Sequence, residues 1–202
     1  MKNSIILGIS ILLLMLYIWD LKKHKLDLRS IITIGIFSGI SYILYIIQFI
    51  KYPQGGGISL FSMVPVMLIS LMYGRSVGLT GGLVFGLLKM LNGMFVVHPA
   101  QFLLDYVLST MGIGLACTFG RESKSKIFVG CLFAVIVSVG INIISGAVYF
   151  GQYAPEGMNV WWYSFIYNAS SAGVEGVLSA VIVTILPMEK FMNSRYVKAY
   201  KS

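Results

Sequence analysis

Residues 127–150 read IFVGCLFAVIVSVGINIISGAVYF, a run of 24 residues without a charged side chain. About 20 consecutive apolar residues are enough to cross the hydrocarbon core of a bilayer as an α-helix. Because lipid offers no hydrogen bonds to a bare backbone, a segment of this kind has to be helical there. This stretch therefore predicts an all-α integral membrane protein.

The composition of the whole chain agrees with a membrane location. Of its 202 residues, 57% are hydrophobic and only 11% are charged, and the mean hydropathy is +0.86. An ordinary soluble domain has about 25% charged residues. These values exclude a soluble enzyme, a disordered chain, a nucleic-acid-binding domain and a small secreted scaffold.

Six further apolar runs are candidates for membrane spans. The third and fourth of the seven are short, so we expect them to be tilted, kinked at Pro65 or only partly spanning. No small-residue cleavage site follows the first run, so we interpret it as an uncleaved helix rather than a signal peptide. The seven predicted spans are 4–19, 31–50, 58–73, 77–91, 102–119, 127–150 and 161–186.

The basic residues indicate how the spans are oriented, because short cytoplasmic loops of membrane proteins carry the excess of Lys and Arg. Twelve of the 15 basic residues fall on one side, whereas Lys2 and Lys51 fall on the other and Lys89 lies near the outer end of the fourth span. We therefore expect a cytoplasmic C-terminus and an external N-terminus. The twelve are Lys22, Lys23, Lys25, Arg29, Arg75, Arg121, Lys124, Lys126, Lys190, Arg195, Lys198 and Lys201.

Three ionisable side chains, Lys89, Asp105 and Glu175, lie within the predicted spans. An ionisable group at membrane depth is costly and by default marks a site, a pathway or a pairing. Asp105 is interpreted as an ion-pair partner of Lys89, as a site residue, or as both, since a ligand can compete for the pair. Glu175, near mid-span, is predicted either to accept hydrogen bonds from neighbouring helices or to stay protonated.

Polar and aromatic residues gather at the predicted outer end of the bundle. The loops 92–101 and 151–160 each join two spans there. Trp161 and Trp162 are interpreted either as part of the aromatic belt at the membrane surface or as part of a site. This concentration predicts a pocket that opens to the exterior and can be closed by loops.

Small residues predict close helix packing in two places. Glycines recur every four residues from 74 to 86, so they would line one face of a helix and let a neighbouring backbone approach. Gly35 and Gly39 form a second pattern of small residues four apart. For this second pattern two alternatives stay open, packing within the bundle and docking against a partner subunit.

Five stretches resemble the thiamine-specific substrate-binding subunit, or S component, of energy-coupling factor (ECF) transporters. The similarity extends from about residue 30 to residue 187, and YSFIYN is its most specific part. The stretches are GGGISLFSMVPVML (55–68), GLTGGLVFGLLKMLNG (78–93), HPAQFLLDY (98–106), ISGAVYFGQYAPEGMN (144–159) and YSFIYNAS (163–170).

The resemblance implies a six-helix S-component bundle over residues 30–187, with a vitamin site near the outer face. Residues 1–29 would then add an N-terminal transmembrane helix and a basic cytoplasmic loop, and residues 188–202 a basic cytoplasmic tail. Members of the family dock on a membrane scaffold (T) subunit that binds two cytoplasmic ATPases, so the S component itself needs no cofactor. Gly35 and Gly39 would correspond to the family's AxxxA docking motif.

The resemblance also implies site residues. The family's acid and the tyrosine after it correspond to Asp105 and Tyr106, and its later tyrosine and asparagine correspond to Tyr163 and Asn168. The carboxylate and the asparagine would hydrogen-bond the aminopyrimidine edge of the vitamin.

Three positions depart from the family. Asn142 replaces a histidine, and Phe150 replaces the tryptophan that stacks on the ligand ring. Stacking of a cationic ring on Phe keeps a cation–π contact but weakens it. Lys89 is unexpected beside a cationic ligand, so it has to pair with Asp105, point outward or indicate a different ligand. The predicted substrate-binding residues are thus Lys89, Asp105, Tyr106, Asn142, Phe150, Tyr163 and Asn168; no catalytic or metal-binding residue is predicted.

Two other classes of function are weaker. A stand-alone secondary transporter would need a path for a coupling ion, yet only Glu175 is charged near the midplane. An intramembrane enzyme would need a nucleophile or metal motif, and no GxSxG, HExxH or GxxxxGK[ST] sequence occurs. We therefore predict a non-enzymatic S component that captures thiamine or a close relative at the extracellular face. The alternatives are a secondary transporter and an S component for a different vitamin or precursor.

Overall fold

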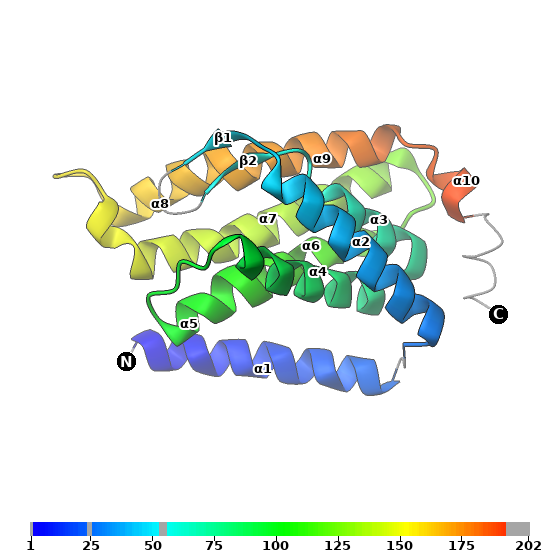
Figure 1. The fold of residues 1–202 in the computed structure, drawn as a ribbon, viewed down its shortest axis with the longest axis horizontal. Coiled ribbons are helices and arrows are strands. Elements are labelled where there is room, and N and C mark those ends of the chain that lie inside the picture. Colours follow the sequence, from blue (N-terminus) through cyan, green and yellow to red (C-terminus); the bar gives the residue numbers. More distant parts are fainter. Residues whose placement is uncertain (1, 24–25, 53–55, 193–202) are drawn as a thin grey trace.

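The computed structural model describes residues 2–23, 26–52 and 56–192, and shows an elongated bundle of helices (Figure 1). Only one short hairpin of strands interrupts the helices of these segments. The helices are α1 (Lys2–Lys23), α2 (Leu28–Ile46), α3 (Val64–Tyr73), α4 (Arg75–Lys89), α5 (Pro99–Phe102), α6 (Ser109–Ile113), α7 (Lys124–Tyr149), α8 (Val160–Asn168), α9 (Val174–Ile185) and α10 (Met188–Met192), and the strands are β1 (Gln48–Lys51) and β2 (Gly57–Ser59).

The described segments contain four helical runs that are long and apolar enough to cross a membrane. Short π-helical segments link the named helices into two of these runs, one from α5 through α6 and one from α8 through α9. The runs are Leu28–Ile46, Pro99–Cys117, Lys124–Tyr149 and Val160–Ile185. The stretch Asn3–Trp19 of α1 is also apolar. The predicted all-α membrane bundle is confirmed.

The second and third predicted spans are wrong at their outer ends. α2 ends at Ile46, and the chain turns back as the antiparallel hairpin β1–β2, in which Gln48 lies opposite Ser59. α3 therefore has only 10 residues and rises about 15 Å, half of the hydrocarbon thickness. Of the alternatives expected for the third span, a helix that only partly spans the membrane is confirmed, and a kink at Pro65 is wrong. Pro65 lies in the first turn of α3, where its missing N–H leaves no hydrogen bond unmade.

Glu175 satisfies the backbone that leads into α3. Its side chain is buried on α9 and accepts hydrogen bonds from the backbone N–H groups of Ser59 and Ser62, both at 2.8 Å. The hydroxyl groups of the same two serines also donate to it, at 2.7 Å. The prediction that Glu175 accepts hydrogen bonds is confirmed, but the donors belong to β2 and the turn after it, not to neighbouring helices.

Phe61 lies between the two serines that Glu175 holds. Its φ of 55° is in the left-handed region, which costs a residue other than glycine about 1–2 kcal/mol. Hydrogen bonds on both sides of Phe61 hold the chain in this conformation. The segment can therefore leave the hairpin and enter α3 within very few residues.

Glycines on α4 bring it into direct contact with the run Pro99–Cys117. A Cβ atom at Gly78 would lie 2.6 Å from the carbonyl oxygen of Gly114. Cβ atoms at Gly82 and Gly86 would overlap the backbone of the same run. The predicted packing role is thus confirmed for these three glycines. Gly74 differs, because it ends α3 with a φ of 100°.

Gly35 and Gly39 lie on α2 with open space in front of them. A Cβ atom at either position would have no neighbour within 4 Å. The alternative that these glycines pack within the bundle is therefore wrong, and the docking alternative stays open.

Helix α1 lies along the side of the bundle, with its N-terminus at the end that holds α5 and α8 (Figure 1). The hydroxyl of Tyr17 is 2.7 Å from Oγ1 of Thr80 on α4. At the other end of α1, Asn3 accepts a hydrogen bond from the hydroxyl of Tyr149 at 3.2 Å. The boundaries 1–29, 30–187 and 188–202 stay predictions, and residues 193–202 of the predicted tail lie outside the described segments.

We expect Glu175→Gln to lower the melting temperature of the ligand-free protein by at least about 5 °C, because the new amide NH₂ would face N–H and O–H donors inside the bundle. Thermal unfolding in detergent measures the change. Glu156→Gln, at an exposed loop position, is the matched control and should shift the midpoint by less than about 1 °C. Equal midpoints for the two variants would contradict the role of Glu175.

Candidate functional site

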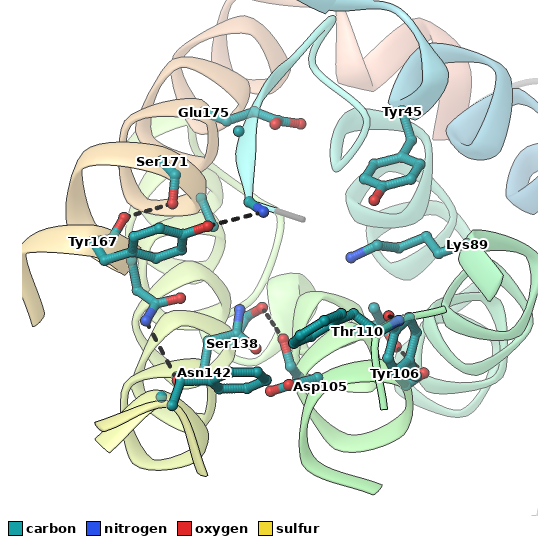
Figure 2. A pocket seen from close by; sticks show the side chains of 18 of the residues that line it. Tyr45, Lys89, Asp105, Tyr106, Thr110, Ser138, Asn142, Tyr167, Ser171 and Glu175 are labelled. Atoms are coloured by element: carbon teal, nitrogen blue, oxygen red, sulfur yellow. Dashed lines mark hydrogen bonds between the residues drawn. The ribbon is translucent and has the colours of Figure 1, made fainter. Parts of the chain in front are cut away.

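A cavity of about 210 Å³ lies among the helices, between α4, α7, α8 and the hairpin β1–β2 (Figure 2). Its wall contains all seven of the predicted substrate-binding residues. They come from four separate parts of the chain: Lys89 ends α4, Asp105 and Tyr106 lie between α5 and α6, Asn142 and Phe150 lie in and just after α7, and Tyr163 and Asn168 lie on α8. The fold thus assembles these residues in one place, and their binding roles stay predictions.

Asp105 is positioned by Gln101, which is 1% exposed. The amide nitrogen of Gln101 donates to Asp105 at 2.6 Å and to the carbonyl oxygen of Phe95 at 3.2 Å. Its amide oxygen accepts from the N–H of Val97 at 3.1 Å. The hydroxyl of Tyr106 accepts from the N–H of Phe95 at 3.1 Å. Gln101 therefore connects the loop before α5 to Asp105 by hydrogen bonds.

Gln101 was not among the predicted site residues. It lies four residues before Asp105 in the stretch HPAQFLLDY, which is one helical turn. This spacing could have identified Gln101 from the sequence. An amide side chain one helical turn before Asp105 lies on the same face and can donate a hydrogen bond that orients the carboxylate.

Asn168 is held by its amide nitrogen. This nitrogen donates to the carbonyl oxygen of Ser164 at 2.9 Å and, more weakly, to that of Asn142 at 3.4 Å. In the described part of the chain, the carbonyl oxygen of the Asn168 side chain accepts no hydrogen bond. It is therefore available as an acceptor for a ligand in the cavity.

Phe150 forms part of an aromatic cluster on the cavity wall. Its ring stacks on Phe95, with centroids 5.8 Å apart and planes at 27°, and on Tyr153 at 6.3 Å and 29°. Flat ring faces of this kind stack on heteroaromatic groups and attract cations. Phe95, which was not among the predicted site residues, brings the loop before α5 onto this cluster.

The hairpin β1–β2 is fastened to α8 across one side of the cavity. The hydroxyl of Tyr167 accepts a hydrogen bond from the N–H of Gly56 at 3.0 Å. The rings of Tyr52 and Tyr167 meet edge to face at 5.5 Å and 71°. A Cβ atom at Gly56 would overlap the Tyr167 ring. Close contact between the hairpin and α8 therefore depends on glycine at this position.

Two π-helical segments lie at the cavity. Leu103–Leu108 contains Asp105 and Tyr106, and Ala169–Gly173 follows Asn168 directly. A π turn adds a residue to the helical repeat and changes the direction of the side chains around it, often at functional sites. The predicted spans 102–119 and 161–186 were expected to be regular helices, so neither π turn was predicted.

Lys89 does not pair with Asp105, so the predicted ion pair is wrong. Within residues 2–23, 26–52 and 56–192, no carboxylate lies within ion-pair distance of its ammonium group. The Nζ atom instead lies 4.9 Å from the ring centroid of Tyr45 and 5.8 Å from that of Phe85. Figure 2 shows it directed into the cavity. The alternative that Lys89 points outward is therefore wrong as well.

Trp161 and Trp162 are outside the cavity wall. They are 55% and 57% exposed and do not line the cavity. In a membrane this exposure favours the aromatic belt over the site. His98 is the N-cap of α5, and its Nδ1 accepts from the N–H of Ala100 at 3.0 Å.

Comparisons with known proteins agree on one family. The family described as "Thiamine transporter protein (Thia_YuaJ)" matches residues 31–193. The chain is 36% identical over 177 residues to the thiamine transporter ThiT of Bacillus subtilis (strain 168), covering 80% of this chain and 92% of that protein. It is 30% identical over 142 residues to the thiamine transporter ThiT of Lacticaseibacillus paracasei (strain ATCC 334), covering 62% and 71%.

A solved structure shows the same fold. The structure described as native-SAD phasing for ThiT from Listeria monocytogenes matches with a TM-score of 0.70 at 21% identity, over 80% of this chain and 93% of that one. The family match begins after α1. Helix α1 is therefore outside the part of the chain that defines the family.

We expect Gln101→Leu to release the loop before α5, because the hydrogen bonds of the Gln101 side-chain amide with Asp105, Phe95 and Val97 are lost. Hydrogen exchange of the backbone amide of Val97 should become at least about tenfold faster, the equivalent of one hydrogen bond of about 1.4 kcal/mol. Gln152→Leu, at an exposed position, should leave this exchange rate unchanged. An unchanged rate in Gln101→Leu would show that Gln101 does not hold the loop.

Proposed function

Because the chain belongs to the thiamine transporter protein (Thia_YuaJ) family, we propose that it is the substrate-binding membrane subunit, or S component, of an ATP-driven ECF-type importer. In this role it captures thiamine or a closely related compound at the extracellular face. One observation carries the proposal: the fold collects Asp105, Asn168 and the Phe150 cluster around one cavity. The relatives that are named thiamine transporters support the choice of ligand.

The chemistry of the cavity suits the two rings of thiamine. An aminopyrimidine presents an amino group, which can donate to Asp105 and to the free carbonyl oxygen of Asn168, and ring nitrogens, which accept hydrogen bonds. The thiazolium ring carries a positive charge, and the face of Phe150 can attract it with up to about 2 kcal/mol when water is excluded. The carboxylate of Asp105 also offsets that charge. Of these three groups, the side-chain oxygen of Asn168 has no partner in the described segments, whereas Asp105 already accepts from Gln101 and Phe150 already stacks on Phe95 and Tyr153.

Glu175 does not suit a stand-alone secondary transporter. A coupling-ion site near the midplane would need free carboxylate oxygens. Both oxygens of Glu175 already accept hydrogen bonds from Ser59 and Ser62. An importer driven by ATP on other subunits needs no such site, and the chain then needs no cofactor and catalyses no reaction itself.

The open glycine face of α2 supports docking on the scaffold subunit. Gly35 and Gly39 have no Cβ neighbour in this chain, and small residues let a partner helix approach closely. Only 22% of the apolar window of α2 is buried within the bundle. Ile32, Ile36 and Ile43 extend the same exposed surface. The scaffold subunit would connect this chain to two cytoplasmic ATPases.

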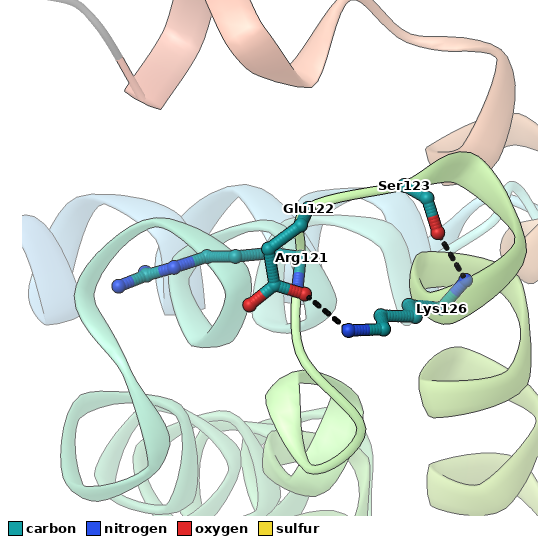
Figure 3. A network of polar contacts seen from close by, with 4 residues as sticks. All are labelled: Arg121, Glu122, Ser123 and Lys126. Atoms are coloured by element: carbon teal, nitrogen blue, oxygen red, sulfur yellow. Dashed lines mark hydrogen bonds and ion pairs between the residues drawn. The ribbon is translucent and has the colours of Figure 1, made fainter.

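The end of the bundle opposite the cavity carries the polar features of a cytoplasmic face. Arg121 donates to two carbonyl oxygens in the last turn of α3, at 2.6 and 3.2 Å. Next to it, Ser123 caps α7, and Glu122 pairs with Lys126 at 3.1 Å (Figure 3). Backbone N–H groups and Lys126 lower the pKa of Glu122. We place this end, the C-terminus and α10 in the cytoplasm and the N-terminus outside.

We expect Asp105→Ala and Asn168→Ala each to raise the Kd for thiamine at least about 100-fold, because each removes a hydrogen-bonding partner of the aminopyrimidine in a desolvated site. Isothermal titration calorimetry with the purified full chain measures the constants. Glu156→Ala removes an acid from an exposed loop at the same end and should leave the Kd unchanged. Failure of the unmodified chain to bind thiamine or any of its phosphates would overturn the proposed ligand.

We expect Gly35→Leu combined with Gly39→Leu to reduce ATP-dependent thiamine uptake at least tenfold, because about eight added carbon atoms would block the approach of the scaffold helix. Thiamine binding to the isolated chain should not change. Gly140→Leu, at another glycine with open space in front of it, is the matched control. Full uptake by the double variant, in proteoliposomes with the scaffold and ATPase subunits, would place the docking surface elsewhere.

A further inference from the structure

The cation of Lys89 is the feature of the cavity that binding of thiamine does not explain. Thiamine is itself a cation, and a second positive charge in the same cavity repels it. Lys89 ends α4, and its side chain is only partly exposed. Its ammonium group is directed into the cavity (Figure 2).

The surroundings of Lys89 stabilise its charge only in part. The rings of Tyr45 and Phe85 meet edge to face, with centroids 6.2 Å apart, and offer their faces to the ammonium group. A cation–π contact attracts the charge without neutralising it. An ammonium group has three donors and no acceptor. Lys89 therefore retains most of its capacity to bind an anion.

The carboxylates on the cavity wall accept hydrogen bonds from uncharged donors, and Asp105 keeps acceptor positions for a ligand. Glu175 is committed to Ser59 and Ser62, and Asp105 accepts from Gln101 at 2.6 Å. Neither lies within ion-pair distance of Lys89 in the described segments. Within the described segments Lys89 therefore has no directly paired carboxylate, and an anionic group of a ligand can take that place.

Asp105 and Lys89 give the cavity two opposite charges on separate segments. Asp105 lies on the π-helical segment and Lys89 on α4, and both side chains line the same space. A ligand that is only cationic satisfies one of these charges and is repelled by the other. A ligand with a positive end and a negative end satisfies both, since charge-assisted hydrogen bonds are the strong ones in desolvated sites.

We propose that Lys89 makes this cavity selective for a phosphate ester of the thiamine type, with the phosphate oxygens bound by the ammonium group and the aminopyrimidine bound by Asp105. The inference rests on the proposed function, because it names the form of the ligand for the same site. A phosphate suits Lys89 because it presents several acceptor oxygens and a full negative charge. Lys89 is thus a specificity-determining residue.

A purely structural role of Lys89 makes a different prediction. As the last residue of α4, Lys89 can interact favourably with the negative end of the helix dipole. In that case its replacement would lower the melting temperature without changing the preference between ligands. The ratio of two dissociation constants therefore separates the two roles.

The test uses the purified full chain and three probes, thiamine, thiamine monophosphate and thiamine diphosphate, with calorimetric Kd values at low and high salt. The unmodified chain should bind the monophosphate more tightly than thiamine. Lys89→Gln should weaken monophosphate binding about 10- to 100-fold, the range of one charge-assisted hydrogen bond, and should tighten thiamine binding, because the charge that repels the thiazolium ring is removed. Lys89→Arg should keep the preference for the phosphate.

Lys124→Gln is a charge-matched control. Lys124 is an exposed cation at the start of α7, far from the end of that helix that reaches the cavity. Its replacement should change neither the Kd of thiamine nor that of the monophosphate. The inference is overturned if Lys89→Gln changes the Kd of thiamine and of its monophosphate by the same factor, or if the unmodified chain prefers thiamine. In those outcomes thiamine still binds and the proposed function stands. If none of the three probes binds, the proposed function fails and this inference fails with it.

Discussion

The four hydrogen-bond donors that converge on Glu175 let the chain leave the helical conformation at membrane depth. Non-helical backbone is tolerated there only where the protein itself satisfies its polar groups. Ser59 and Ser62 provide two N–H groups and two hydroxyl groups, and one carboxylate accepts from all of them. Without this acceptor, the N–H groups of Ser59 and Ser62 would lose their hydrogen-bond partner at this depth.

The cavity exists because the chain before α3 is not helical. α3 has 10 residues and fills only about half of the membrane thickness. The space where a full-length helix would continue is bordered by the hairpin, and Gly56, Ser62 and Glu175 all line the cavity. The same carboxylate therefore stabilises the short helix and forms part of the wall of the site.

Helix α4 contributes both to the packing of the bundle and to the charges of the cavity. Its glycines allow the run Pro99–Cys117 to lie against it, and that run carries Asp105. The last residue of the same helix is Lys89, so a single helix both positions the acid and supplies the opposite charge. The π turns then decide how the neighbouring side chains are directed. Small changes in helix contact at the glycines would consequently move both charges.

The sequence by itself determined the membrane class and the helical architecture, and its resemblance to a known family identified seven residues of the cavity wall. The class and the architecture depend on local composition, because lipid excludes charge and requires helices over about 20 residues. Asp105 was identifiable for the same reason, as an ionisable group within an apolar run, whereas Asn168 was identified through the resemblance. Only the tertiary structure decided that the third span is a 10-residue helix preceded by the end of a hairpin and a turn, that Gln101 and Tyr167 fasten the loops, and that Lys89 is directed into the cavity instead of to Asp105. Each of these depends on partners or directions that no local pattern contains: Ser59 and Glu175 are 116 residues apart, and the direction of a side chain is set by the helices packed around it.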